Sequence, residues 1–252
     1  MRSILLILML GAFVFAGAQV SGGSGSILIQ AKPIKSGDKL KLARKRFYLF
    51  NGGLKENTQL LDRIKSAAFT SRDCYYTQAK ASPAFMCWLQ QENCDGPFCR
   101  PVLQGEVAGV PEFDVAYKKG LTLYNSKPAL ALSWLINNLD APLVAGYYDQ
   151  QRAFVDRVLG GLKPLQTTQA TITAAEAYFV DLPVSDKGQK YLVSTIIPVE
   201  LGDKSFVWTC EVTDLGPNKF LSKVPLPLKT NAKCQVTEVK QQICKTEACP
   251  AK

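Results

Sequence analysis

The chain has 252 residues, of which 47% are hydrophobic and 20% charged, with a formal net charge of +9 and no histidine. This length suits one large or two small domains, since domains commonly have about 100–200 residues. The absence of histidine excludes a Ser-His-Asp triad, a Cys-His dyad and a histidine-ligated zinc. The modest basic excess indicates an ordinary solvated surface, and no nucleic-acid partner is expected.

The amino terminus is typical of a secretory signal peptide. Arg2 precedes an apolar stretch at residues 4–15, and Ala16-Gly17-Ala18 forms a small-x-small cleavage signal. The apolar stretch is shorter than the roughly 20 residues of a spanning helix. We therefore expect a signal peptide at residues 1–18 and a flexible lead-in at residues 19–26. The mature chain is expected to lack a transmembrane segment and to be exported, either to the periplasm or outside the cell.

Two short strands are expected next, at residues 26–32 and 39–50. Leu42 and Phe47 have opposite parity, so one regular strand cannot direct both toward the same core. We therefore expect a bulge or twist near residues 43–45.

Basic and aromatic side chains are next to one another in the second strand. Arg44, Lys45 and Arg46 lie beside Phe47 and Tyr48. Arg44, Lys45, Arg46 and Tyr48 form a candidate contact patch for an anionic envelope polymer or another exported protein. The alternative is a strand edge that charged residues protect from aggregation.

Helical spacing and capping residues predict five helices. Ser82 followed by Pro83 is typical of a helix start, and Gly160-Gly161 of a helix end. The predicted helices cover residues 54–68, 82–93, 111–124, 126–139 and 140–160.

Eight cysteines in an exported chain indicate disulfides, although their pairing stays open. They are Cys74, Cys87, Cys94, Cys99, Cys210, Cys234, Cys244 and Cys249. The turn between Cys94 and Cys99 makes a bridge between those two easy, and Cys74–Cys87 would close a longer loop. Crossed pairing of these four, or a Cys₄ zinc site, is the alternative. Cys210 is expected to pair with Cys234, and Cys244–Cys249 repeats the spacing of Cys94–Cys99.

From residue 167 the apolar period changes to two, which predicts strands at 167–182, 190–201 and 204–214. A two-residue turn at Gly202-Asp203 would fix the register of a hairpin between the last two strands. The expected opposite pairs are Val199 and Phe206, Ile197 and Trp208, Thr195 and Cys210, and Val193 and Val212. Pro198 is expected to interrupt pairing. Residues 216–252 are expected to be mostly irregular, with an extended segment at 224–228 and a strand at 232–240.

These elements predict an α+β fold. Short strands and disulfide-linked helices come first, then three helices, then an antiparallel β-meander with a cysteine-tethered tail. The proposed division is a strand and cysteine-rich helical module at residues 27–108, and a helical run with its sheet at residues 109–252. The two parts can also pack as a single domain.

Four segments carry a resemblance to known proteins: residues 44–54 (RKRFYLFNGGL), 71–76 (SRDCYY), 92–100 (ENCDGPFCR) and 196–212 (IIPVELGDKSFVWTCEV). They resemble a family of exported bacterial proteins with no assigned activity. The resemblance implies bacterial export and disulfide bonds, and it implies no functional residue.

No catalytic, cofactor-binding or metal-binding residue is predicted. The chemistry still open to the chain is a Ser-Lys pattern at Ser36 and Lys39, or a pair of carboxylates. The formal carboxylate pairs are Glu112 with Asp114, Asp181 with Asp186, and Glu200 with Glu211. The favoured hypothesis is a non-enzymatic binding or structural protein of the bacterial envelope or extracellular space. A glycan-directed hydrolase that uses carboxylates, and a secreted inhibitor or adhesin, are the alternatives.

Overall fold

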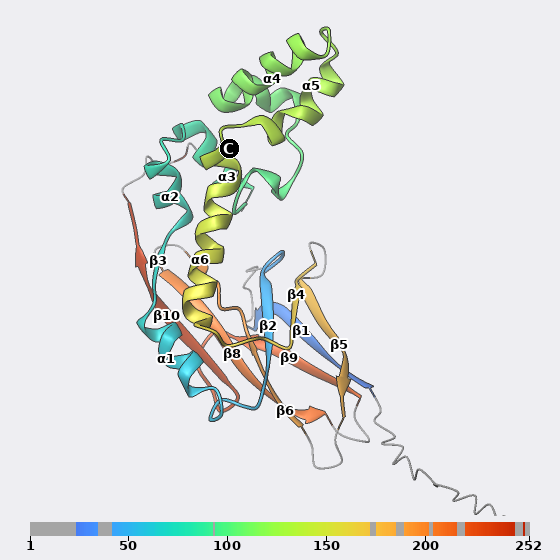
Figure 1. The fold of residues 1–252 in the computed structure, drawn as a ribbon, viewed down its shortest axis with the longest axis vertical. Helices are drawn as coiled ribbons and strands as arrows, with labels where there is room; N and C mark the ends of the chain where they lie inside the picture. Colours follow the sequence, from blue (N-terminus) through green and yellow to red (C-terminus); the bar gives the residue numbers. More distant parts are fainter. Residues whose placement is uncertain are drawn as a thin grey trace, which may run out of the picture.

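The computed structural model describes residues 24–34, 42–92, 94–171, 175–184, 189–201, 204–215, 220–244 and 249. It has the predicted α+β fold (Figure 1). The predicted signal peptide, most of the lead-in, and Ser36 with Lys39 lie outside the described residues. No helix in the described part of the chain is long and apolar enough to cross a membrane.

The described helices lie mainly in the first two thirds of the chain. They are α1 (Thr58–Ser66), α2 (Arg72–Gln78), α3 (Pro83–Gln91), α4 (Pro111–Leu123), α5 (Pro128–Leu135) and α6 (Tyr147–Leu159). Short 3₁₀ turns cover Pro97–Cys99, Gln104–Gly109 and Ile136–Asn138, and a π-helical turn at Pro142–Gly146 leads into α6.

The described strands form two sheets. A three-stranded sheet has the order β5 (Glu176–Pro183), β1 (Ser24–Ile34) and β9 (Leu221–Pro227). A seven-stranded sheet has the order β3 (Ala68–Thr70), β10 (Cys234–Gln242), β8 (Lys204–Leu215), β6 (Gln189–Ser194), β2 (Arg46–Asn51) and β4 (Gln166–Gln169), with β7 (Val199–Leu201) paired to β8. Pairing crosses residue 108, because β1 pairs with β5 and β9 while β2 pairs with β4 and β6.

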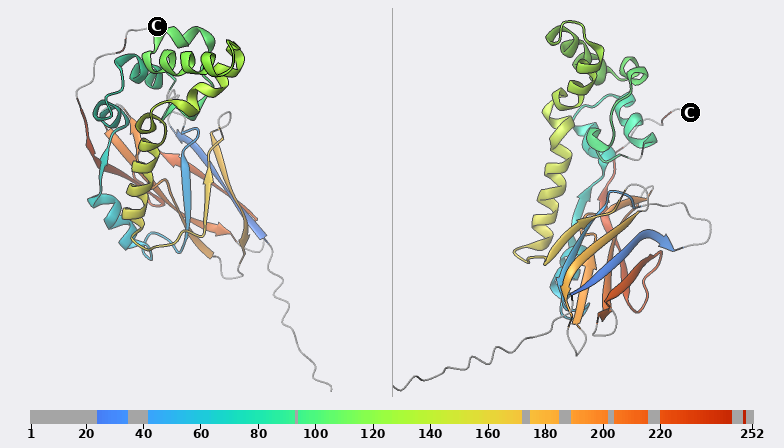
Figure 2. Two further views of the ribbon diagram at one scale, coloured as in Figure 1. Left: turned by 45° about the horizontal axis from the view of Figure 1, so that its top comes forward. Right: turned by 90° about the vertical axis from the view of Figure 1, so that its right-hand side faces the viewer.

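The seven-stranded sheet is the middle of three layers (Figure 2). Tyr48 and Phe50 of β2 pack among the helices, whereas Phe47 and Leu49 pack toward the three-stranded sheet. Residues that alternate along a strand point to opposite faces, so β2 is buried on both. The chain turns at Ala43 and Arg44 before β2 begins, within the segment where a bulge was predicted.

Side-chain caps explain where two helices begin. The hydroxyl of Ser82 accepts a hydrogen bond from the backbone N–H of Phe85 at the start of α3, as the sequence predicted. Ser71 does the same for Cys74 at the start of α2, a helix that the sequence analysis did not predict. At the far end of α6, Gly160 has a φ of 49°, the left-handed conformation that ends helices.

The prediction of one continuous strand at residues 167–182 is wrong. The segment contains two strands in two sheets, with β4 paired to β2 and β5 paired to β1. Ala175, just before β5, has a φ of 52° and is incompatible with a continuous extended strand. The start of β1 at Ser24 also lies within the predicted lead-in.

The predicted hairpin register is confirmed next to the turn and wrong beyond it. Val199 lies opposite Phe206, as predicted, but Val193 lies opposite Cys210 instead of Val212. The shift of two residues arises between β6 and β7, where Ile196 has a φ of 50° and pairing is interrupted before Pro198. Because the shift is even, Val193 still points toward the three-stranded sheet.

The C-terminal part is more regular than predicted. Instead of a mostly irregular tail, residues 221–227 form β9, which runs parallel to β1, and β10 extends from Cys234 to Gln242. β10 is antiparallel to β8 and pairs at its end with β3.

All eight cysteines are paired in disulfides. The bridges Cys94–Cys99 and Cys210–Cys234 agree with the pairing expected from the sequence. The pairing of Cys74 with Cys87, and of Cys244 with Cys249, is wrong: Cys74 is joined to Cys244, and Cys87 to Cys249. Two disulfides therefore fasten the C-terminal segment to α2 and α3, and no cysteine thiolate is left for the alternative Cys₄ zinc site. Four disulfides fit an oxidising environment.

Candidate functional site

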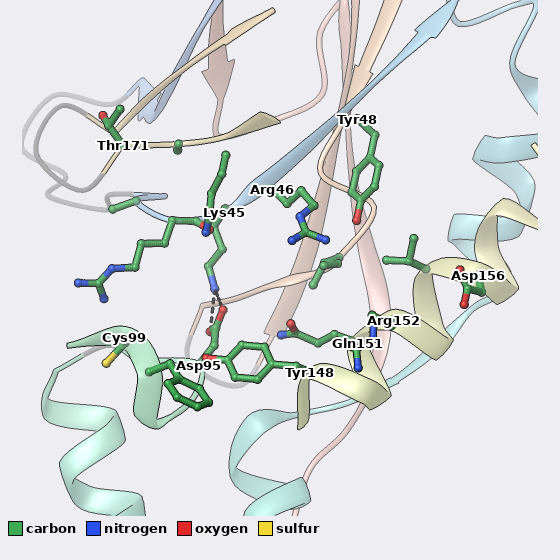
Figure 3. Close-up of a pocket in the computed structure, with 17 residues that line it drawn as sticks. Lys45, Arg46, Tyr48, Asp95, Cys99, Tyr148, Gln151, Arg152, Asp156 and Thr171 are labelled. Carbon is green, nitrogen blue, oxygen red and sulfur yellow. Dashed lines mark hydrogen bonds and ion pairs between the residues drawn. The ribbon is translucent and has the colours of Figure 1, made fainter. Parts of the chain in front are cut away.

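A pocket of ≈ 920 Å³ lies between the turn before β2 and helix α6 (Figure 3). We call it the basic pocket. Five segments line it: the start of β2 with the turn before it, the disulfide-closed loop from Cys94 to Cys99, α6, the end of β4 with the residues after it, and Ile197 between β6 and β7. Its polar and aromatic lining includes Arg44, Lys45, Arg46, Tyr48, Asp95, Phe98, Tyr148, Gln151, Arg152, Asp156, Gln169 and Thr171. All four residues of the predicted contact patch are among them.

The turn before β2 is fixed to the end of β4. The backbone N–H of Arg44 donates to the carbonyl of Ala170 at 3.0 Å, and the Gln169 amide donates to the carbonyl of Arg44 at 2.6 Å. Arg44 itself has a φ of 63°. Positive φ is uncommon for residues other than glycine, and strained backbone is often found at functional sites. These two hydrogen bonds hold Arg44, Lys45 and Arg46 at one wall of the basic pocket.

Lys45 is paired with the loop that forms the adjacent wall. Its Nζ lies 2.8 Å from both carboxylate oxygens of Asp95. Burial alone would raise the pKa of Asp95, but Lys45, Arg72 and Arg44 outweigh it and lower that pKa below its ordinary value. Asp95 is therefore ionised at neutral pH and neutralises Lys45.

The other cations of the basic pocket have less complete partners. The Nε of Arg44 is buried and has no hydrogen-bond partner among the described residues. Arg152 is exposed and forms an ion pair with Asp149, a residue of the same helix. Asp149 does not line the pocket. Arg46 points from β2 toward α6, where Gln151 and Arg152 lie (Figure 3). A buried donor without a partner is costly, and this Nε is too deeply covered to be the atom that meets a ligand.

Two phenols of the basic pocket stay neutral at physiological pH. Burial raises the pKa of Tyr148 to about 12, and the charge of Asp95 adds to the rise. Burial also raises the pKa of Tyr48, although Arg46 opposes the shift. Neutral phenols donate and accept hydrogen bonds and do not repel an anion.

No family model, curated protein or solved structure matches this chain. Function is therefore inferred from the basic pocket itself. The sequence predicts only one wall of it; the other lining residues Asp95, Tyr148, Gln151, Arg152 and Asp156 were not predicted. One signal for the second wall was present: Gln151 occupies an apolar stripe of the predicted third central helix, and it is buried in the structure.

The carboxylates of two pairs considered for a hydrolase are bound to different partners. Glu112 accepts two hydrogen bonds from Ser82, at 2.6 and 2.7 Å, whereas Asp114 is paired with Lys118. Glu200 and Glu211 have different partners too, as described next. Asp186 lies outside the described residues. Glu112, Glu200 and Glu211 accept hydrogen bonds that hold the fold together, and Asp114 forms an ion pair within α4.

Glu200 and Glu211 each fasten a different part of the fold. Glu211 accepts from the backbone N–H of Leu54 at 2.9 Å. Glu200 accepts from the backbone N–H of Arg72 at 2.7 Å and from the phenol of Tyr147 at 3.1 Å. Burial raises the pKa of Glu200 above its ordinary value, and its hydrogen bonds only partly oppose the shift.

This raised pKa predicts a pH-dependent effect of Glu200→Gln. A group with a raised folded-state pKa stabilises the fold fully below its unfolded-state pKa, and loses that contribution as pH rises through the folded-state pKa. Gln keeps an acceptor for Arg72 and Tyr147 but carries no buried charge. We therefore expect the stability of Glu200→Gln relative to the original chain to increase as the pH rises above the ordinary glutamate pKa of 4.5. Urea unfolding at a series of pH values measures it.

The matched control for that experiment is Glu238→Gln, which removes an exposed carboxylate paired with Lys204. An equal pH trend in both variants, or a decrease for Glu200→Gln, would contradict the assignment of a buried charge to Glu200.

Proposed function

We propose that this chain is an exported, disulfide-stabilised and non-enzymatic binding protein whose partner is anionic. The observation that carries the proposal is the basic pocket. Arg44, Lys45, Arg46 and Arg152 come from two separate elements to one hollow of ≈ 920 Å³.

The place of action is the bacterial envelope or the extracellular space. The signal-peptide pattern, the resemblance to exported bacterial proteins and the four disulfides support export. The structural partners of Glu112, Asp114, Glu200 and Glu211 support binding over catalysis.

The test is calorimetric titration of the purified, non-reduced chain with dextran sulfate, with neutral dextran as the control ligand. We expect dextran sulfate to bind and Arg46→Gln/Arg152→Gln to weaken binding by about 100-fold. A charge-assisted hydrogen bond contributes about 1.5–3 kcal/mol, and 1.4 kcal/mol is tenfold in affinity.

The matched control is Lys65→Gln/Lys119→Gln, which removes the same charge from exposed positions outside the basic pocket. We expect a change of less than about twofold, because separated surface charges are screened at physiological salt. Equal losses in the two double variants would mean that general basicity, not the pocket, binds the polyanion. Turnover of a glycan that is lost in a carboxylate variant would overturn the non-enzymatic assignment.

A further inference from the structure

The basic pocket contains both signs of charge. Asp95 and Asp156 line it together with the basic residues. Asp95 is neutralised by Lys45, but the carboxylate of Asp156 has no ion pair with any of the described residues. Asp156 is exposed on α6, one turn after Arg152, so the two opposite charges lie on the same face of that helix.

Because the pocket has a carboxylate, unpaired among the described residues, beside its arginines, it should bind some kinds of anion more tightly than others. A ligand with only anionic groups, such as a polyphosphate, would be repelled by Asp156 while it contacts Arg46 and Arg152. A ligand that also has hydroxyl groups can donate one to the Asp156 carboxylate, which only accepts hydrogen bonds. The phenol of Tyr48, whose pKa the charge of Asp156 helps to raise, is neutral and can do either.

The remaining lining suits the polar edges and apolar face of a ring. Gln151 provides an amide, and Gln169, whose amide N–H donates to the carbonyl of Arg44, keeps its amide oxygen as an acceptor. Phe98, on the disulfide-closed loop, is 50% exposed at the pocket and offers an apolar face. The volume of ≈ 920 Å³ is near the top of the range of about 300–1,000 Å³ that holds ligands of drug size. A single small anion would leave most of it empty.

We infer that the ligand of the basic pocket is an acidic oligosaccharide. Its carboxylates contact Arg44, Arg46 and Arg152, and one of its hydroxyls donates to Asp156. This inference rests on the proposed function and goes beyond it by naming the class of ligand. Arginine is suited to this role because its planar fork binds carboxylates bidentately.

Single-stranded nucleic acid fits the same pocket less well. Proteins that bind it offer successive aromatic platforms for stacked bases. Among the described lining aromatics, only Phe98 is exposed; Tyr48 is buried and Tyr148 is half-buried.

The test compares four probes by calorimetry: trigalacturonate, tripolyphosphate, a trinucleotide of DNA and neutral maltotriose. The diagnostic variant is Asp156→Ala, at an exposed helical position where alanine is well tolerated. We expect trigalacturonate to bind the original chain and maltotriose not to bind. In Asp156→Ala, the affinity for trigalacturonate should fall about tenfold, while that for tripolyphosphate should rise severalfold because a repulsion is removed. Asp62→Ala, on the exposed side of α1, is the matched control and should change neither affinity.

Each other outcome overturns the inference in a recognisable way. If Asp156→Ala strengthens both anionic probes alike, the carboxylate repels all anions and no hydroxyl is bound there. If tripolyphosphate or a trinucleotide of DNA binds more tightly than trigalacturonate, the ligand class is wrong while anion binding stands. If neither these probes nor dextran sulfate binds, the proposed function itself fails.

Discussion

Removal of both disulfides that hold the C-terminal segment is expected to destabilise the fold by about 8 kcal/mol, more than the two single removals added together. Cys74–Cys244 and Cys87–Cys249 join residues 170 and 162 positions apart. In the chain-entropy model, closing a loop of this length contributes about 5 kcal/mol. Both bridges close nearly the same loop, and their contributions are therefore coupled.

The coupling follows from the positions of the cysteines. When one bridge is intact, the other closes only a ring of about 18 residues, which contributes about 3 kcal/mol. Each single removal, made by replacing both partners with alanine, is therefore expected to cost about 3 kcal/mol. Because domains have only about 5–15 kcal/mol of stability in total, the chain without either bridge should be largely unfolded.

Urea unfolding under non-reducing conditions measures these differences. The matched control is removal of Cys94–Cys99, which are 5 positions apart; so short a loop should cost about 2 kcal/mol. Additive losses for the two long-range bridges, or a folded chain without both of them, would contradict the coupled model.

The cysteine pairing shows what sequence proximity can and cannot indicate. Cys94–Cys99 and Cys210–Cys234 follow local geometry, since one closes a turn and the other joins residues directly opposite each other on β8 and β10. Cys74 and Cys87 are near each other in sequence, yet each pairs with the C-terminal segment. Loop-closure entropy grows slowly with length, so distance along the chain is a weak guide to pairing.

The strand errors have a related cause. An apolar period of two identifies extended backbone but not the sheet to which it belongs. Residues 167–182 keep that period while the chain passes from one sheet to the other between β4 and β5. The register slip at Ile196 has no sequence signal of its own, because a β-branched residue rarely adopts a positive φ. Only Pro198 indicated an interruption.

The wall of the basic pocket at the start of β2 could be predicted, because its residues are consecutive in the sequence. Arg44, Lys45 and Arg46 are consecutive, and the expected break in the strand fell among them. The opposite wall depends on how α6 and the loop from Cys94 to Cys99 pack, which no local pattern reveals. That loop brings Asp95 and Phe98 to the pocket. The Cys94–Cys99 bridge is expected to contribute less to the stability of the fold than either long-range bridge, but it closes the loop that carries Asp95 and Phe98.

Trp208→Ala is expected to cost about 4 kcal/mol, the largest effect of any single substitution considered. Trp208 is buried between the two sheets, and its indole N–H donates to the carbonyl of Pro227 at the end of β9, at 2.7 Å. The substitution creates a cavity, and it also leaves that carbonyl without its partner. A cavity left by a large aromatic residue accounts for about 3–5 kcal/mol.

Two comparison variants separate these contributions. Trp208→Phe keeps most of the apolar volume and loses the hydrogen bond, so we expect a loss of about 1–2 kcal/mol. Trp134→Ala removes a half-buried tryptophan from α5 and should cost about 1 kcal/mol. Urea unfolding gives all three values. Equal losses for Trp208→Ala and Trp134→Ala would show that the interior between the sheets contributes little to stability.

Hydrogen exchange then shows where the structure loosens. In Trp208→Ala, the amides of β1 and β9 should lose protection before those of α6, because Trp208 bonds to the end of β9 and packs with the layer that contains both strands. α6 packs in the other hydrophobic cluster, on the far side of the seven-stranded sheet. Since α6 carries one wall of the basic pocket, that wall should keep its protection when the layer that contains Trp208 weakens. Loss of protection in α6 first would mean that the two sides of the central sheet are not independent.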